Sequence, residues 1–326
     1  MRHTCILAFF LSIQTGISAQ DTFSIVAVDP ISGEIGSAGA SCLDDSDISG
    51  GVTIISDLIP GIGAIHTQSY WLYSNQINAH EKMLEGLSPQ EIIDWLIAND
   101  VQGNPEIRQY GIVDFVTAEP RSAAFTGVNC FDVKEHKTGA NYAIQGNILL
   151  NDDIIDGMET AFLNTEGSLA ERLMATLQAA NIPGADSRCL EEGVSSQSAF
   201  LRVARPNDDI NSLYLDIEVL QTLYGVEPID SLQVLFDEWQ ANSMEYSDQK
   251  PITIFPNPAN SEINISGLNP GKYHFEIKDL RGSVILKGDL LSSSKIQVEE
   301  LHSSIVVISI YDENSAIIIR RKLIIE

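Results

Sequence analysis

The alternation of apolar and polar positions predicts short strands at the start of the chain, followed by helices. Period-two runs occupy Phe23 to Val28, Ile35 to Ser41, Val52 to Ile55 and Gly63 to Thr67. A helix is then predicted at Gln76 to Leu87, with an apolar stripe formed by Ile77, Met83, Leu84 and Leu87.

A second helix is predicted to begin immediately after Ser88. Ser88 can cap the helix, Pro89 suits its first turn, and Glu91 can reach back to complete a capping box. Ser168 and Glu171 repeat this spacing later in the chain. Two helix starts are therefore marked by local sequence alone.

The central region continues to alternate between groups of strands and helices. Further strands are predicted at Tyr110 to Asp114, Ser122 to Thr126, Tyr142 to Gln145, Ser198 to Ala204 and Leu213 to Val219. Further helices are predicted at Asp153 to Phe162, Leu169 to Ala180 and Leu232 to Trp239. Strands that follow one another in groups favour antiparallel sheets covered by helices. We therefore expect an α+β fold, a four-layer αββα sandwich.

The pattern changes entirely to β after a polar segment without periodicity, residues 241–250, which we interpret as a linker. Seven short strands spaced by about 8–12 residues indicate a small all-β sandwich. They are predicted at Thr253 to Phe255, Ile263 to Ile265, Tyr273 to Asp279, Ser283 to Lys287, Lys295 to Val298, Ile305 to Tyr311 and Ile317 to Ile325.

The first 19 residues have the features of a secretory signal peptide. Arg2 and His3 precede an apolar run, Cys5 to Ile13, and small residues end at Ala19. The run is too short for a membrane span, which needs about 20 residues. We expect a signal peptide at 1–19, a central domain at 20–240, the linker at 241–250 and the β-domain at 251–326, with no membrane span.

Charge narrows the choice of partners. The chain has 19 basic and 45 acidic residues, a net charge of −26. Residues 251–326 contribute 8 and 9 of these, so the first 250 residues hold 11 and 36, a net charge of −25. Such a surface repels nucleic acid and anionic membranes. It would tolerate cationic ligands, and it also keeps an exported protein soluble.

Three cysteines remain after signal removal: Cys42, Cys130 and Cys189. Export permits one disulfide with one thiol left over, and the sequence does not choose the pair. Cys42 could alternatively act as a nucleophile with His66 as its base. We favour Cys42 as half of a disulfide and His66 as a buried, hydrogen-bonded histidine.

Metal and cofactor sites are not expected. Asp44, Asp45, Asp47 and Asp57 could offer carboxylates to calcium, but the segment lacks the full EF-hand pattern, and a solvated loop is favoured. No zinc-ligand spacing and no phosphate-binding loop is present.

The C-terminal module resembles the sorting domain of type IX secretion in Bacteroidetes. The resemblance rests on several motifs: Phe255-Pro256-Asn257-Pro258-Ala259-Asn260, Asp279-Leu280-Arg281-Gly282 and Arg321-Lys322-Leu323-Ile324-Ile325. It implies that the type IX secretion machinery is a partner and that the protein is secreted or held at the cell surface.

The central region, from Thr22 to Trp239, resembles an uncharacterised bacterial family with the fold of N-terminal-nucleophile (Ntn) hydrolases. The motifs are Thr22 to Pro30, Ser32 to Gly36, Gly61 to Ala64, Phe125 to Gly127, Gln145 to Leu149 and Ser196 to Ala199. The resemblance implies the same αββα fold. It also implies a nucleophile at Thr22, where the relatives share their start.

In such enzymes a side chain attacks while its own α-amine, with a pKa of about 8, accepts the proton. Asp29, at the end of the first strand, is the candidate that would orient Thr22. Cleavage after Ala19 would leave the Thr22 nitrogen in a peptide bond. No Lys or Arg lies between Arg2 and Lys82, so a tuning cation would have to come from Arg108 or Arg121.

Gln145 and Asn147 carry amides that could bind a polar ligand or simply tie a strand to a loop. Two functions remain open. One is a non-catalytic or ligand-binding surface protein built on the hydrolase fold, which we favour. The other is an amidohydrolase that uses Thr22 as its nucleophile after further processing.

Overall fold

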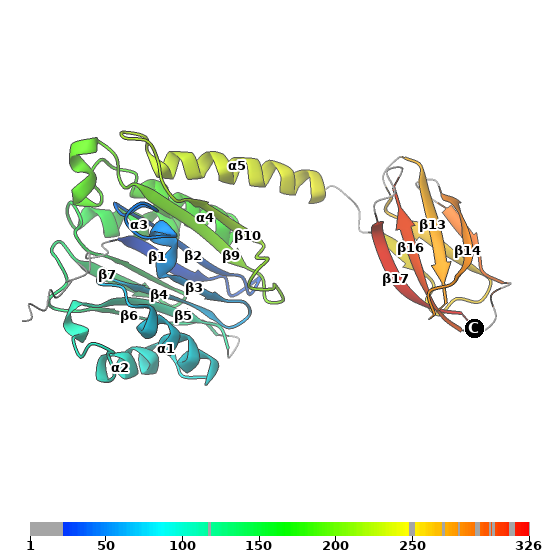
Figure 1. The fold of residues 1–326 in the computed structure, drawn as a ribbon, viewed down its shortest axis with the longest axis horizontal. Coiled ribbons are helices and arrows are strands. Elements are labelled where there is room, and N and C mark those ends of the chain that lie inside the picture. The colour runs from blue at the N-terminus through cyan, green and yellow to red at the C-terminus, as the bar shows by residue number, and fades with distance from the viewer. Residues whose placement is uncertain are drawn as a thin grey trace, which may run out of the picture. The chain divides into compact units, whose positions relative to one another are not determined.

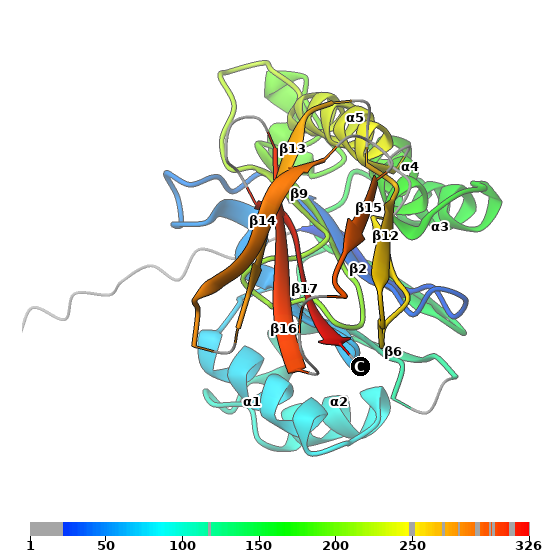
Figure 2. The same cartoon turned by 90° about the vertical axis from the view of Figure 1, so that its right-hand side faces the viewer.

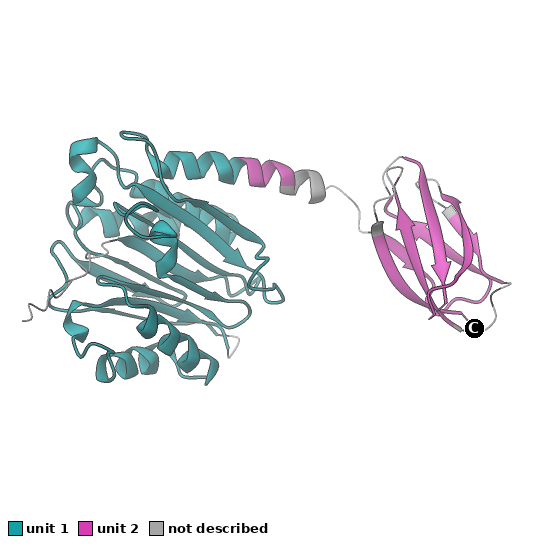
Figure 3. Cartoon of the chain, in the orientation of Figure 1, with its two compact units in different colours: residues 1–237 teal, residues 238–326 magenta. Residues whose placement is uncertain are grey.

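The computed structural model describes residues 22–116, 119–247, 252–268, 271–279, 281–290, 294–299, 301, 304–312 and 317–325. The chain divides into two compact units, residues 1–237 and 238–326 (Figure 3). The first unit mixes helices and strands and the second is built around strands, which confirms the predicted α+β fold with an all-β C-terminal region.

The larger sheet of the first unit has six antiparallel strands in the order β10-β9-β2-β1-β8-β7. Their bounds are β1 Phe23–Val28, β2 Ile35–Ser41, β7 Glu135–Gly139, β8 Tyr142–Gly146, β9 Ser198–Ala204 and β10 Leu215–Val219. The strand β1 is central because it pairs with β2 on one side and β8 on the other.

The smaller sheet has four antiparallel strands in the order β3-β4-β5-β6. Their bounds are β3 Ser56–Ile59, β4 Gly63–Gln68, β5 Gln109–Asp114 and β6 Arg121–Thr126. The two sheets face each other: Val26 and Val28 of β1 pack with Leu58, Ala64 and Val113.

Two helices cover the outer face of each sheet (Figures 1 and 2). The smaller sheet is covered by α1, Tyr73–Leu84, and α2, Pro89–Ala98. The larger sheet is covered by α3, Asp153–Asn164, and α4, Leu169–Ala179. Each sheet of this unit therefore has its own pair of helices.

Both predicted capping boxes are confirmed. Ser88 accepts from the Glu91 amide and its own amide donates to Glu91 Oε2 over 2.8 Å. Ser168 and Glu171 make the same reciprocal bonds, with 2.7 Å from the Ser168 amide to Glu171 Oε2. Local sequence was sufficient here because each box is closed within one helical turn.

Three of the predicted elements were wrong. The predicted strand at Val52 to Ile55 is a 3₁₀ helix, η1 Gly51–Ile55, because Gly50 and Gly51 turn the chain with φ of 93° and 49°. The first helix was predicted three residues too late in the sequence, and the side of it that is buried was also predicted wrongly. Ile77 and Leu84 are 36% and 56% exposed, whereas its buried residues are Asn75, Gln76, Ala79 and Met83.

The third difference concerns the end of the central unit. The helix α5, Pro228–Ser247, continues through residues 241–247, where we expected an irregular linker. Its first turns are anchored by buried apolar residues, Ile229, Leu232 and Phe236. The exact domain boundaries remain a prediction. Two short helices complete this unit, η2 Pro105–Ile107 and η3 Ser187–Glu192.

The second unit contains two antiparallel sheets, β11-β12-β15 and β14-β13-β16-β17. Their bounds are β11 Thr253–Phe255, β12 Glu262–Ser266, β13 Tyr273–Lys278, β14 Val284–Leu290, β15 Ser294–Gln297, β16 Ser304–Tyr311 and β17 Ile317–Ile325. Alternate residues of both sheets form one apolar core. The Asn257 side chain accepts from the Ile324 amide over 2.9 Å and donates to the Lys322 carbonyl over 3.1 Å, so it joins the two ends of the module.

Candidate functional site

Thr22 lies at the end of the central strand β1, between the two sheets, and is 1% exposed. The pairing of Phe23 with Ala40 and Gly146 places Ser41 and Asn147 on either side of Thr22. Residues directly opposite each other on neighbouring strands point to the same face of a sheet. The row Ser41, Thr22 and Asn147 therefore presents three polar side chains to the end of the smaller sheet.

A buried chain of hydrogen bonds begins at the Thr22 carbonyl, which accepts from Gln68 Nε2 over 3.0 Å. The other end of that amide, Gln68 Oε1, can only accept, so Ser24 Oγ donates to it over 2.6 Å. His66 Nδ1, which lies 2.9 Å from Ser24 Oγ, must then carry the proton and donate to Ser24. The Thr22 carbonyl thus fixes the tautomer of a buried histidine.

The same chain continues beyond His66 to the surface. His66 Nε2 is left to accept from Ser37 Oγ over 2.6 Å, and Ser37 lies 2.7 Å from Ser56 Oγ. Arg202 approaches Ser56 and pairs with Asp216 over 3.0 Å. Burial, assisted by the charge of Arg202, lowers the pKa of His66 to about 3. His66 is therefore a neutral, satisfied histidine, as its position on an apolar strand indicated.

Gln145 and Asn147 belong to this cluster, and both are fully buried. Gln145 Nε2 donates to Ser24 Oγ over 2.7 Å, and a Cβ added at Gly111 would lie 1.8 Å from Gln145 Oε1. Gln145 thus fills the space left by a glycine on the facing sheet. Asn147 donates from its amide nitrogen to Gln109 Oε1 over 2.9 Å, and its Oδ1 has no hydrogen-bond partner within the described part of the chain.

Strained backbone surrounds the Thr22 carbonyl. Within the described residues, the non-glycine residues with positive φ are Ser69, Tyr70 and Ile148, at 56°, 53° and 52°. Ser69 and Tyr70 directly follow Gln68, whose side chain donates to the Thr22 carbonyl. Ile148 directly follows Asn147, whose backbone N–H donates to the same carbonyl over 3.2 Å. Such conformations cost about 1–3 kcal/mol each and cluster at functional sites.

Arg108 holds one of these strained segments and does not act on Thr22. Its guanidinium donates to the Tyr70 carbonyl, to Gln102 Oε1 over 2.8 Å and to Asp100 Oδ2 over 2.8 Å. Burial alone would raise the pKa of Asp100, but hydrogen bonds from Arg108, Asn104 and Asn75 lower it to about 2. Asp100 therefore stays ionised at any ordinary pH, and Arg108 fixes Tyr70.

Arg188 is the cation that reaches the row beside Thr22. Its Nη2 lies 3.5 Å from Ser41 Oγ and 2.6 Å from Asp186 Oδ2, and the second interaction is an ion pair. The sequence argument missed Arg188 because it considered Arg108 and Arg121. Arg121 instead pairs with Asp114 at the far end of β5.

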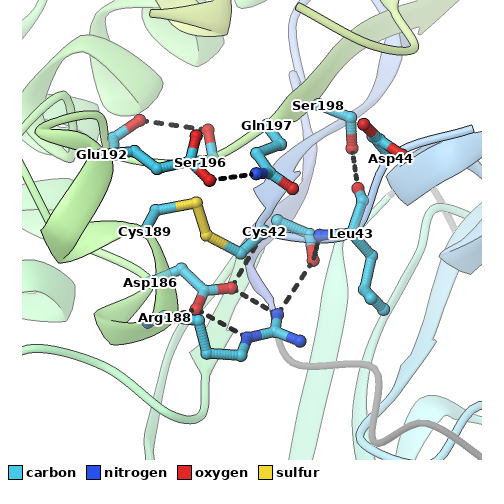
Figure 4. The surroundings of a disulfide bond; sticks show 12 residues. Cys42, Leu43, Asp44, Asp186, Arg188, Cys189, Glu192, Ser196, Gln197 and Ser198 are labelled. Carbon is cyan, nitrogen blue, oxygen red and sulfur yellow. Dashed lines mark hydrogen bonds and ion pairs between the residues drawn. A yellow bond between two sulfur atoms is a disulfide. The ribbon is translucent and has the colours of Figure 1, made fainter. Parts of the chain in front are cut away.

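A disulfide joins Cys42, just after β2, to Cys189 of η3, with 5.9 Å between their Cα atoms (Figure 4). The expectation of one disulfide among three cysteines is thereby confirmed in the structure. Asp186 also accepts from the Cys42 amide over 2.9 Å. The thiol of Cys130 lies elsewhere and donates to the Arg108 carbonyl over 3.3 Å.

Asp29 does not meet Thr22, which corrects the proposed orienting role. The two residues lie at opposite ends of β1, roughly 23 Å apart at about 3.3 Å per residue. Asp29 instead stabilises the β1–β2 turn by accepting from the Ile31 amide over 2.9 Å and from Ser32 Oγ over 3.1 Å. Thr22 and Asp29 are close in sequence, but the extended strand between them holds them far apart in space.

The acidic segment after β2 binds its own loop. Asp44 Oδ1 accepts from the Ser46 amide and hydroxyl, whereas Asp57 pairs with His80 over 2.7 Å. Within the described residues, no group of three or more His, Cys, Asp or Glu side chains is arranged to hold a metal ion.

The fold and this cluster define a two-unit protein: a two-sheet α+β domain with a polar cluster at the end of its central strand, followed by a β-module. The chain belongs to the family of unknown function DUF1028, whose model matches residues 22–229 and so begins at Thr22 itself. Residues 253–326 match the secretion system C-terminal sorting domain, which marks a secreted or cell-surface protein. No described helix is long and apolar enough to cross a membrane.

A solved structure supports the fold of the central unit. The crystal structure of protein SPO2555 from Silicibacter pomeroyi, a DUF1028 protein, is similar with a TM-score of 0.56 and 22% identity. The similarity covers 71% of this chain and 95% of that one. A DUF3244 protein with an immunoglobulin-like β-sandwich from Bacteroides vulgatus matches at 18% identity over 24% of this chain and 88% of its own, but its TM-score of 0.21 supports no argument. No curated protein matches.

Proposed function

We propose that the central unit has the αββα arrangement of Ntn hydrolases and hydrolyses amide bonds through Thr22 once Thr22 becomes the first residue. The observation that carries this proposal is the convergence of strain on one carbonyl. Both segments that hydrogen-bond Thr22 O run directly into non-glycine residues with left-handed backbone. Strain of this kind persists where a surrounding structure requires a fixed geometry.

The reaction would use groups already placed at Thr22. The Thr22 hydroxyl attacks the substrate carbonyl while the α-amine of the same residue accepts its proton. The proton passes to the departing amine, and water then hydrolyses the ester formed on Thr22. Asn147, directly opposite Thr22, has an Oδ1 with no partner among the described residues, and this oxygen can accept from the α-amine.

Arg188 supplies the cation that this chemistry favours. Its guanidinium lies 3.5 Å from Ser41 Oγ in the row beside Thr22, and it is paired there with the Asp186 carboxylate. A nearby positive charge lowers the affinity of an amine for its proton. The Asp186 carboxylate, which is paired with Arg188, offsets part of this effect on the Thr22 α-amine.

The proposal requires a cut before Thr22. Cleavage after Ala19 leaves Gln20 and Asp21 in place, and an amide nitrogen cannot act as the base. The family match that starts at residue 22 supports a mature domain beginning there. The uncut chain would be inactive.

A non-catalytic surface protein is the second candidate, and one observation favours it. Thr22 is 1% exposed and the cavity beside it measures about 10 Å³, close to the size of one water molecule. A non-catalytic protein built on this fold would have the same buried Thr22 and the same small cavity.

The deciding experiment has two steps. N-terminal sequencing of the exported protein establishes whether the mature chain starts at Thr22. Protein prepared with Thr22 first is then treated with an epoxyketone probe. The probe's ketone carbon bonds to the hydroxyl oxygen while the α-amine opens the epoxide, so that both groups must be present.

We expect labelling of the Thr22-first protein, none for Thr22→Ala and partial labelling for Thr22→Ser. Thr138→Ala, at an exposed position on β7, is the matched control for loss of a threonine hydroxyl. A folded Thr22-first protein that takes up no probe would refute catalysis at Thr22 and leave the scaffold function.

A further inference from the structure

The cavity beside Thr22 has one polar end and otherwise apolar walls. Thr22 and Ser41 form the polar end. The remaining walls come from the segment that runs from Leu43 to the end of η1, with Leu43, Ile48, Val52 and Ile55 among the lining residues. A side chain that enters this cavity would therefore contact hydrocarbon next to the candidate nucleophile.

The walls are held by bonds to three other segments. Ser198 Oγ donates to the Leu43 carbonyl and accepts from the Val52 amide over 3.1 Å. The Asp45 amide donates to the Leu220 carbonyl over 3.0 Å. Cys42 is fixed by the disulfide at the start of the segment (Figure 4). A wall tied at so many points does not open freely to a large group.

The size of the cavity limits what it can accept. Its volume of about 10 Å³ suits one water-sized group, such as a methyl. A charged group there would lose its hydration to a wall that offers no countercharge, which is strongly unfavourable. A longer aliphatic group would need the wall to move.

We propose that this cavity is the subsite for the acyl-side residue of the substrate and that it selects glycine or alanine. The inference rests on the proposed function, because it takes Thr22 as the nucleophile. The substrate class is then an amide or peptide bond that follows a residue with no side chain or a methyl side chain.

Labelling rates test this selection directly. Thr22-first protein is treated with epoxyketones that differ only in the residue next to the ketone: glycine, alanine, valine, leucine or glutamate. We expect alanine or glycine to react fastest, with a loss of roughly 10–200-fold for each surplus methylene. Equal rates for alanine and leucine would overturn the subsite.

A cavity-enlarging variant sharpens the test. Val52→Ala should raise the rate of the valine probe at least tenfold relative to the alanine probe, since it adds room for the extra carbons. Val101→Ala, an exposed valine in the same unit, is the matched control and should change neither rate. An unchanged preference in Val52→Ala would also overturn the subsite.

Binding separates failure of the subsite from failure of the chemistry. Protein that begins at residue 22 and carries Thr22→Ala is titrated with N-acetyl-alaninamide or N-acetyl-leucinamide. The methyl resonances of Val52 and Leu43 are followed by NMR. Shifts with the alanine compound only would uphold the subsite even if no probe labels Thr22, in which case the proposed catalysis alone fails. No shift with the alanine compound would refute the subsite.

Discussion

The buried, neutral His66 predicts a specific loss of stability in mild acid. Its pKa is about 3 in the folded protein, against about 6.5 in an unfolded chain. Between these values the unfolded state binds a proton that the folded state does not. Folding is therefore most stable above pH 6.5, and this contribution is lost progressively as the pH falls toward 3.

The magnitude follows from the two pKa values. Linkage gives a loss of about 2 kcal/mol between pH 7 and pH 5 and about 3 kcal/mol by pH 4. The full difference of 3.5 units corresponds to about 5 kcal/mol. Asp100, with a pKa lowered to about 2, adds to acid destabilisation only below about pH 4. Burial also lowers the pKa of His136, and this contribution is common to wild type and to a His66 variant.

The assay is urea unfolding at fixed ionic strength from pH 7 to 4.5, followed by tryptophan fluorescence. The three tryptophans are Trp71, Trp95 and Trp239, so the signal does not come from the sorting module. His66→Gln, which keeps a neutral polar side chain, should be less stable at pH 7 but should lose about 2 kcal/mol less than wild type on going to pH 5.

Groups common to both proteins cancel in this comparison. His274→Gln, in the sorting module, is the control and should leave the wild-type slope unchanged. If His66→Gln and wild type show the same dependence on pH, the buried hydrogen-bond chain through His66 has been assigned incorrectly.

Two further predictions concern the disulfide and the sorting module. Denatured, unreduced mature protein should contain one reactive thiol, at Cys130, and three reactive thiols would contradict the disulfide. The double substitution Cys42→Ser and Cys189→Ser should lower the free energy of unfolding by up to about 5 kcal/mol, which is the loop-entropy value for a separation of 147 residues. A chain that ends at Gln240 should fold cooperatively and stay in the periplasm of the native host. If this shortened chain is unfolded, the division into two domains is wrong. If it reaches the cell surface, the sorting role of the C-terminal module is wrong.

Local patterns predicted much of the fold because their partners lie nearby in sequence. The bounds of β1 and β2 and both capping boxes follow from alternation and from contacts within one turn. The face of α1 could not be predicted in this way. Asn75 is buried because it donates to Asp100 over 2.6 Å, and Gln76 because it donates to the Ile54 carbonyl over 2.9 Å. Those partners lie more than 20 residues away.

The candidate site was predicted only in part for the same reason. Resemblance pointed to Thr22, and the structure brings Asn147 opposite it. Gln68 was missed, although a polar residue at the end of an otherwise largely apolar strand is a usable signal. Arg188 could not be found from the sequence, because it approaches Ser41 across 147 residues through a fold that only the structure reveals.

If Thr22 is the nucleophile, two events of export would have to precede activity. Removal of residues 1–21 provides the α-amine, and an oxidising compartment allows Cys42 to bond with Cys189. The second event matters at the site because Cys42 follows Ser41, which flanks Thr22, while Cys189 follows Arg188, which reaches Ser41. The bond thus ties Arg188 to the row that contains Thr22. Reduced, uncut protein inside the cell would lack both the base and the tether, so an amidohydrolase built in this way becomes competent only outside the cytoplasm.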